Sequence, residues 1–115
     1  VPGGVVLPFR FVHVVGRRAI VSGHAPQAAD GSLAKPTGKV GRDLDVAQGY
    51  AAARLVGLSI LGSLSRALGS LDRIAQWVRV FGMVNSAPGF NLQPAVINGC
   101  SDLIIEVSIS PAWTP

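Results

Sequence analysis

One long helical pattern constrains this chain more than any other feature of its sequence. Apolar residues recur at three- and four-residue spacing over residues 46–68, which is the spacing of one helix face. Asp45 followed by Gln48 is a capping-box pattern, and Gly69 stands where a left-handed C-terminal residue is favoured. These signals predict a helix of about 23 residues, roughly 34 Å long. Its expected core face comprises Val46, Tyr50, Ala53, Gly57, Ile60, Leu64 and Leu68.

Short β-branched runs come before this helix. Residues 11–15 and 19–22 are separated by Gly16-Arg17-Arg18, a pattern that predicts a β-hairpin. Pro26 follows the second run closely, and proline cannot donate to a strand ladder. Residues 27–45 are rich in Gly, Asp, Lys and Pro, so we expect a loop there, with a short strand near residues 38–40.

The segment 74–84 is apolar on both of its alternating faces. This pattern predicts a central strand that is covered on both sides. The long helix can cover one face, whereas the other face requires a further partner. The even face carries Ile74, Val78, Val80 and Val84; the odd face carries Ala75, Trp77, Phe81 and Met83 around the charge of Arg79.

A loop over residues 85–93 leads to a second predicted helix, because Pro94 suits a first helical turn. The order of these elements predicts an α+β domain with helices on one face of a sheet. The tail 108–115 contains two prolines and no periodicity, so we expect it to be irregular. The expected core face of the second helix comprises Val96, Gly99, Cys100, Leu103 and Val107.

The composition indicates one folded domain that has partners. A chain of 115 residues with 49% hydrophobic and 14% charged residues has room for one core and is far from the disordered range. The surplus of apolar residues suggests a homo-oligomer. Gln48, Arg54 and Arg66 interrupt the segment 46–68, so we expect no transmembrane helix. The N-terminal residues show no signal-peptide pattern.

The net charge of +4 and the pI near 10.2 raise the possibility of an RNA partner. The arginines are scattered, apart from the pair Arg17-Arg18, and this favours a solvated basic surface over a phosphate-binding stripe. The single cysteine, Cys100, excludes an internal disulfide and fits a reducing cytoplasm.

Few side chains suggest chemistry. Cys100 is either a nucleophile or, more in keeping with a lone helical cysteine, a packing residue. His24, at a strand end, either lines a cleft or stabilises a turn, and His13 is read as structural. Arg79, between Trp77 and Phe81 on its face, is either stacked at a subunit interface or faces a cleft.

Other combinations are weaker still. Asn98 and Asp102 lie one helical turn apart and either share a site or are simply solvated. Two histidines and one cysteine at wide spacing make no metal site, and the glycines form no phosphate-binding fingerprint. We therefore expect no metal and no cofactor.

The chain resembles the YjgF/RidA family, often labelled endoribonuclease L-PSP, in six segments that follow one another in the family's order. The resemblance implies a chorismate-mutase-like mixed sheet with two helices on one face, and a trimer with clefts between subunits. It also implies hydrolysis of reactive 2-aminoacrylate-type enamines and imines to ketoacids and ammonia, whereas some members are described as ribonucleases acting on messenger RNA. The segments are 21–26, 38–41, 48–54, 68–74, 78–85 and 98–103.

The sequence also departs from the family pattern. The family usually continues after the second helix with a strand opened by an arginine that holds the substrate carboxylate, and then with a last strand bearing a glutamate. Nothing after Val107 answers to either residue, so we expect a family-like domain over 1–107 and a divergent tail over 108–115. The family's asparagine beyond the loop phenylalanine falls on Pro94, and His24 stands where glutamine is common.

Three hypotheses follow from the resemblance. The first is an enamine/imine deaminase, impaired by loss of the arginine, that takes a small anionic enamine, imine or ketoacid ligand. The second is RNA cleavage or binding, and the third is a non-catalytic oligomer that binds a small ligand. In each case we expect a homotrimer in the cytoplasm without a membrane partner. The candidate cleft residues are Gly23, His24, Arg79 and Asn85.

Overall fold

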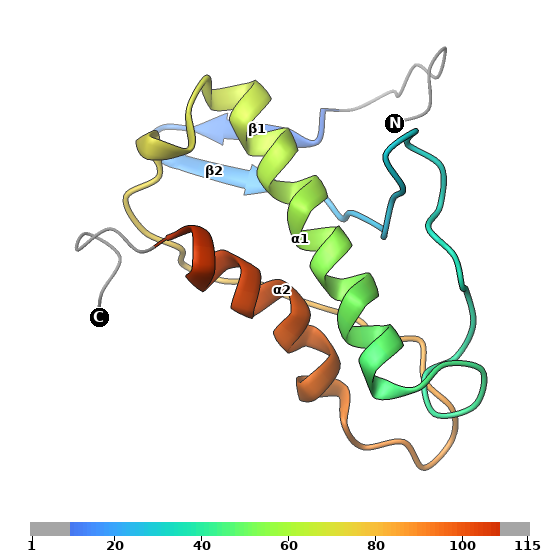
Figure 1. The fold of residues 1–115 in the computed structure, drawn as a ribbon. Helices are drawn as coiled ribbons and strands as arrows, with labels where there is room; N and C mark the ends of the chain where they lie inside the picture. Colours follow the sequence, from blue (N-terminus) through green and yellow to red (C-terminus); the bar gives the residue numbers. More distant parts are fainter. Residues whose placement is uncertain (1–9, 109–115) are drawn as a thin grey trace.

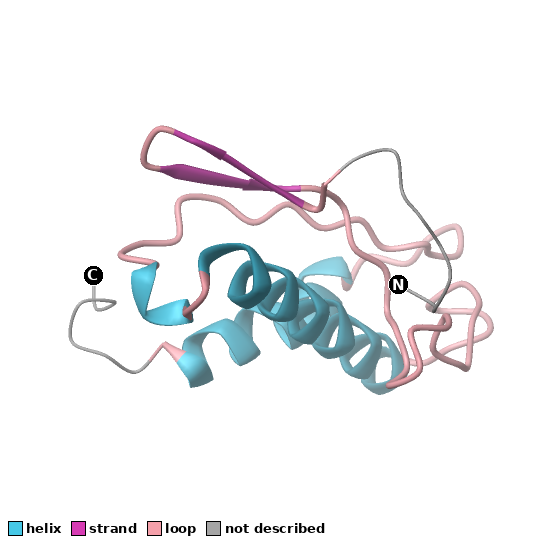
Figure 2. Cartoon of the chain, turned by 90° about the horizontal axis from the view of Figure 1, so that it is seen from above, coloured by secondary structure: helices cyan, strands magenta, loops and turns pink. Residues whose placement is uncertain are grey.

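The structure is a computed structural model that describes residues 10–108. Two layers are visible: the hairpin and extended segments lie on one side, and the two helices lie side by side on the other (Figures 1 and 2). This arrangement confirms the predicted α+β class. The elements are β1 (Val12–Val15), β2 (Arg18–Val21), α1 (Val46–Leu68), the short 3-10 helix η1 (Leu71–Arg73) and α2 (Gln93–Val107).

The predicted hairpin is present. β1 and β2 pair antiparallel from Val12 opposite Val21 to Val15 opposite Arg18. The two-residue connection begins with Gly16 at φ 59°, a left-handed conformation that glycine adopts at little cost in hairpin turns. Ser22 then extends the pairing, because its N–H donates to the carbonyl of Phe11 at 2.8 Å.

Helix α1 begins and ends where its local signals predict. The Gln48 N–H donates to Asp45 Oδ1 at 2.8 Å, and the Asp45 N–H donates to Gln48 Oε1 at 2.9 Å, which completes the capping box. Gly69 ends the helix at φ 83°, with its N–H bonded to the carbonyl of Ser65. The core face is only partly as expected, because α1 packs against α2 on one side and the hairpin on another. Its buried residues are Gly49, Gly57, Leu61, Ser63 and Leu64.

Helix α2 is also confirmed, with one correction to its core face. Val96, Gly99, Cys100 and Leu103 are buried as predicted, but Ile104 takes the place that we expected for Val107. Val107 is 50% exposed. Val107 is the last residue of α2 and lines a hollow beside Leu61, Leu71 and Trp77, which leaves half of the residue exposed.

The two helices run parallel and in close contact. Gly49 faces Val96, whereas Gly57 faces Cys100 and Leu103, so the residue numbers rise together along both helices. A side chain at residue 99 would collide with the carbonyl oxygen of Tyr50. Glycines at this seam therefore allow the two backbones to approach each other.

The predicted strand over 74–84 is wrong for the isolated chain. The sheet in the described part of the chain has two strands, and segment 74–84 has no ladder partner there. Val78 is 88% exposed and Met83 is 85% exposed. An extended segment becomes a strand only when a neighbour supplies backbone hydrogen-bond partners. Within residues 10–108 the segment joins no strand ladder, and the sheet there consists of β1 and β2.

The short strand expected near 38–40 is likewise replaced by isolated bridges from Val40 to Leu44 and to Ser86. The Val40 N–H donates to the carbonyl of Asn85, and the Ala87 N–H donates to that of Val40, both at 2.9 Å. Val40, Leu44 and Val96 form a small buried cluster under Phe90. The cluster fixes the loop 85–92 against both helices. Residues 109–115 of the expected irregular tail lie outside the described part.

By length and composition alone α1 could cross a membrane, whereas its interrupting polar residues led us to expect no transmembrane helix. Its 23 residues include an 18-residue window with a mean hydropathy of 1.3. In that window 28% is buried, and α1 packs against α2 along Gly49 and Gly57.

Candidate functional site

His24 connects the two layers of the molecule. Its Nδ1 lies 2.7 Å from the carbonyl oxygen of Ser22, and its Nε2 lies 2.8 Å from Ser63 Oγ on α1. The imidazole also contacts the Phe11 ring, with 4.6 Å between ring centroids. Of the two roles considered, these contacts support the turn-stabilising one, because both ring nitrogens are engaged inside the fold.

The segment around Gly23 is held from both sides. Ser22 Oγ donates to the carbonyl of Arg10 at 3.4 Å, and the Ser22 carbonyl accepts from the His24 ring. Gly23 between them is exposed, and a Cβ placed on it would meet no atom within 4 Å. The Gly23 backbone is therefore presented to solvent by a braced turn.

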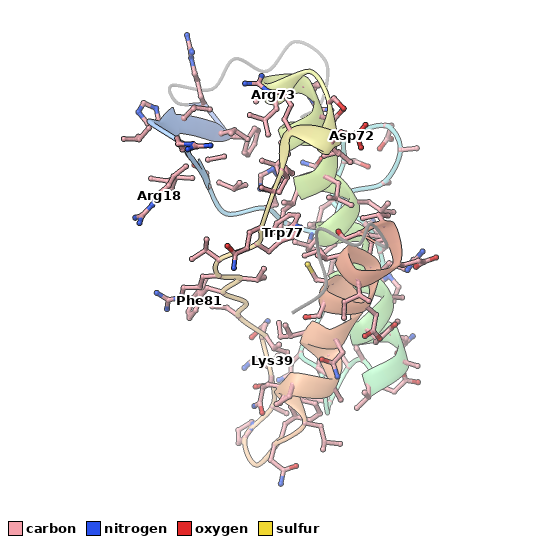
Figure 3. The ribbon with its side chains drawn as sticks, turned by 90° about the vertical axis from the view of Figure 1, so that its left-hand side faces the viewer. Arg18, Lys39, Asp72, Arg73, Trp77 and Phe81 are labelled. Atoms are coloured by element: carbon pink, nitrogen blue, oxygen red, sulfur yellow. The ribbon has the colours of Figure 1, made fainter. Side chains whose placement is uncertain are left out.

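Arg79 lies on the exposed face of the extended segment. Its guanidinium carbon is 5.9 Å from the centroid of the Phe81 ring, within range of a cation–π contact. Figure 3 shows Phe81 on the side of the segment away from the helices, whereas Trp77 lies toward them. This contact supports the stacked alternative for Arg79, and the subunit interface of that alternative stays a prediction. The two ion pairs among residues 10–108 join Arg42 to Asp43 and Arg54 to Glu106, so neither uses Arg79.

Asn85 is exposed, and its carbonyl accepts from Val40. The four candidate cleft residues thus belong to two regions: Gly23 and His24 at the hairpin end, and Arg79 and Asn85 on the connection between the helices. Within the described ranges no hydrogen bond or ion pair joins one region to the other. A single chain does not assemble them into one site.

The remaining chemical candidates have structural roles. Cys100 is buried between the helices, and burial raises the pKa of its thiol, which reduces thiolate reactivity at neutral pH. Asp102 accepts a 2.7 Å hydrogen bond from Tyr50 Oη, and this bond raises the pKa of the tyrosine. Asn98 is exposed, as is His13, which lies opposite Ile20 in the hairpin.

Ser63 and Arg66 contact the His24 region but are not among the candidates expected from the sequence. Ser63 is 6% exposed and accepts a 3.3 Å hydrogen bond from Arg66 Nη2 in addition to its contact with His24. A serine on a helix gives no signal for a partner 39 residues away, although its three-residue spacing from Arg66 indicates a shared helix face. Across the described residues no group of three His, Cys, Asp or Glu side chains is arranged to hold a metal ion.

A two-layer α+β domain with parallel helices and an open, apolar strand side defines the class of this protein. The chain belongs to the family described as YjgF/chorismate mutase-like, putative endoribonuclease, which it matches over residues 5–112. The predicted family resemblance and the chorismate-mutase-like fold are thereby confirmed.

Three similar proteins illustrate the membership. The chain is 41% identical over 92 residues to Protein TCP17 of Trypanosoma cruzi and spans 56% of that protein's length, so about half of it. The crystal structure of Atu1372, a protein of unknown function from Agrobacterium tumefaciens, is 39% identical to this chain, with a TM-score of 0.84. The match covers 96% of this chain and 70% of that structure's chain. The crystal structure of a putative endoribonuclease from Shewanella oneidensis MR-1 is 30% identical to this chain, with a TM-score of 0.84. The match covers 99% of this chain and 78% of that structure's chain.

Proposed function

We propose that this protein hydrolyses reactive enamines and imines of the 2-aminoacrylate type to ketoacids and ammonia, and that Arg79 holds the substrate carboxylate. The proposal rests on the exposure of Arg79 and on the contacts of its guanidinium. Its guanidinium is exposed, lies over the Phe81 ring and belongs to neither ion pair of the described chain. A planar guanidinium can bind a carboxylate through two parallel hydrogen bonds.

The site requires more than one copy of the chain. Apolar side chains are exposed on the same segment as Arg79 and on the hairpin, and such surfaces mark interaction sites. We propose that further copies, three in total, cover this face and enclose the guanidinium in a cleft. Enclosure matters because a charge-assisted bond is stronger where water is excluded. The exposed side chains include Val15, Ile20, Val78, Phe81 and Met83.

The chemistry requires no electron transfer. 2-Aminoacrylate tautomerises to the imine, water adds to the C=N carbon, and ammonia leaves as the carbonyl of pyruvate forms. Arg79 would hold the carboxylate next to the reacting carbon and favour addition of water by withdrawing electron density. We place this activity in a reducing cytoplasm, where the buried Cys100 remains a thiol.

The test is ketoacid release from an enamine generated in situ by a dehydratase. Removing one partner of an enclosed charge pair costs about 2–5 kcal/mol, so Arg79→Ala should lower kcat/KM by roughly 30- to several-thousand-fold. Arg79→Lys should restore part of the activity. Arg17→Ala, at the exposed hairpin turn, is the control and should have no effect.

Wild-type protein without turnover would overturn the proposal. So would an Arg79→Ala variant within about threefold of wild type. If ketoacids bind without turnover, the chain is a ligand-binding relative and not an enzyme.

RNA binding is the second candidate. Arg17 and Arg18 are both exposed at the hairpin turn, and a similar structure carries the name putative endoribonuclease. Phosphate contacts make affinity fall with salt, so binding of a single-stranded RNA should weaken steeply between 50 and 200 mM salt. Replacing both arginines by glutamate should reduce the salt slope by about 2. An unchanged slope in this variant would rule out the hairpin as the RNA contact.

A further inference from the structure

We propose that one end of the molecule, the hairpin end, is a docking surface for a membrane that contains anionic lipids. The surface consists of five exposed arginines around the β1–β2 hairpin, and the inference does not depend on the proposed function. Two parts of the chain supply them: Arg10, Arg17 and Arg18 belong to the hairpin segment, whereas Arg66 lies in the last turn of α1 and Arg73 ends η1.

Charge is distributed unevenly over the molecule. The hairpin end comprises residues 10–24 and 63–73, which the hydrogen bond between His24 and Ser63 joins. Figure 1 shows the hairpin, the C-terminal end of α1 and η1 at this end, and Figure 3 shows Arg18 and Arg73 there. With histidines neutral, it holds five of the ten lysines and arginines but one of the six acidic residues, and thus the whole net charge of +4. Arginines that are scattered in the sequence are gathered by the fold.

The charge of these arginines is not cancelled by ion pairs. Both ion pairs of residues 10–108 lie outside the hairpin end. Arg66 Nη2 donates to Ser63 Oγ at 3.3 Å, and Arg73 Nη1 donates to the carbonyl of Leu68 at 2.8 Å. These neutral partners orient the two guanidiniums and leave their charge available to anionic headgroups, which attract basic residues near a membrane surface.

The side chains among the arginines favour a lipid surface over RNA. Val14, Val15 and Ile20 are 54%, 52% and 58% exposed on the hairpin. Such aliphatic side chains can enter the boundary between headgroups and acyl chains. Single-stranded RNA is bound through aromatic side chains on which its bases stack, and the aromatic residue of this segment, Phe11, is packed against the His24 ring.

The surface is compatible with further copies on the strand side. Neighbouring residues of a strand point to opposite faces, so Val14 lies on the other face of the hairpin from Val15 and Ile20, and it remains accessible when a copy covers those two. The polar residues that interrupt α1 led us to expect no membrane partner. They bear on a helix that spans a membrane, whereas the proposed contact is with the membrane surface.

Cosedimentation of the full chain with lipid vesicles tests the docking surface. At about 100 mM salt the protein should bind vesicles that contain about 30% phosphatidylserine, and it should not bind vesicles of phosphatidylcholine alone. Removing one arginine should weaken binding by about fivefold, the equivalent of about 1 kcal/mol at 1.4 kcal/mol per decade. The loss should be similar for Arg18→Gln, on the hairpin, and for Arg73→Gln, on the helix layer.

Two further variants test the position of the charge and the aliphatic contact. Lys35→Gln removes the same charge from an exposed residue outside the hairpin end and should change binding by less than about twofold. Val14→Ser removes an exposed aliphatic side chain, so it should weaken vesicle binding by about fivefold. It should leave the affinity for a single-stranded RNA unchanged.

The proposal is overturned if the protein does not bind anionic vesicles, or if it binds neutral vesicles equally well. It is also overturned if Lys35→Gln weakens binding as much as Arg73→Gln, because the effect would then belong to net charge and not to the hairpin end. If the chain binds RNA and Val14→Ser leaves vesicle binding unchanged, the surface is an RNA contact and not a lipid contact.

Discussion

Along the seam between α1 and α2, glycines at 49, 57 and 99 bring the backbones so close that a side chain at 99 would strike the Tyr50 carbonyl. On the strand side, Val78 and Met83 are 88% and 85% exposed, and segment 74–84 belongs to no strand ladder in the described residues. The helix layer is therefore closely packed, whereas the strand side is an open layer whose apolar side chains are exposed.

The difference follows from where each element finds its backbone partners. A helix satisfies its own N–H and C=O groups within four residues, so α1 and α2 need only a packing surface. A strand takes its partners from another segment, and segment 74–84 joins no strand ladder within residues 10–108. We therefore expect a partner to cover the open layer, and we expect changes in the two layers to have different consequences.

The largest effect should come from filling the helix seam. Gly99→Val places a branched side chain against the Tyr50 carbonyl and the Ala53 Cβ, so we expect the free energy of unfolding to fall by about 3 kcal/mol. Urea denaturation measures the change. Gly23→Ala is the control, because a Cβ there meets nothing within 4 Å, and it should stay within about 0.5 kcal/mol of wild type. Equal stability of the two variants would show that the seam is not tight.

Substitutions in the open layer should weaken the association between chains and leave the stability of the single chain unchanged. Val78→Asp combined with Met83→Asp puts charges where a second copy would bury apolar surface. We expect the self-association constant to weaken by at least about 30-fold, or 2 kcal/mol. Sedimentation velocity at micromolar concentration measures this change. Leu58→Asp, on the helix layer and 49% exposed, should leave association intact. A wild-type protein that sediments as a monomer at this concentration would contradict the expected self-association.

A smaller effect is expected where the seam reaches the surface. The hydroxyl of Tyr50 donates to Asp102, which raises the tyrosine pKa. Because the folded pKa lies above the unfolded value of about 10, the contribution is complete below that pH and is lost as pH rises through the folded pKa. Tyr50→Phe should lower the urea midpoint slightly and remove this alkaline loss, as urea titrations at pH 8 and pH 11 would show. An alkaline loss that persists in Tyr50→Phe would assign it to another group.

The smallest effect should be local to the loop that adjoins the open layer. Arg42 and the Lys39 N–H bond Asp43, and these bonds hold the pKa of its carboxyl below the usual range. Stability from this carboxylate is present above the unfolded value of about 3.9 and is lost as pH falls through the lower folded value. Amide shifts of Val40 and Leu44 should therefore move below pH 4, and Asp43→Asn should abolish the movement. Shifts that persist in Asp43→Asn would refute this assignment.

The candidate site was less predictable than the fold. The Ser22–Gly23–His24 turn and Arg79 stand out as residue types, yet the chain places them in separate regions. The role of His24 was undecidable from sequence, because Ser63 lies 39 residues away and belongs to the other layer. Arg79 could be read as a stacked cation because Phe81, two residues on, shares its face in an extended segment.

Local chemistry determined the bounds of the regular elements. Asp45, Gln48 and Gly69 fixed α1, and Gly16 fixed the hairpin turn, because a cap or a tight turn is completed by atoms within a few residues of each other. The tertiary structure alone decided that Ile104 and not Val107 is buried, and that His24 ties the hairpin to α1. It also decided that segment 74–84 joins no strand ladder among residues 10–108. These outcomes depend on how layers dock, and a periodic sequence specifies which faces are apolar without specifying what covers them.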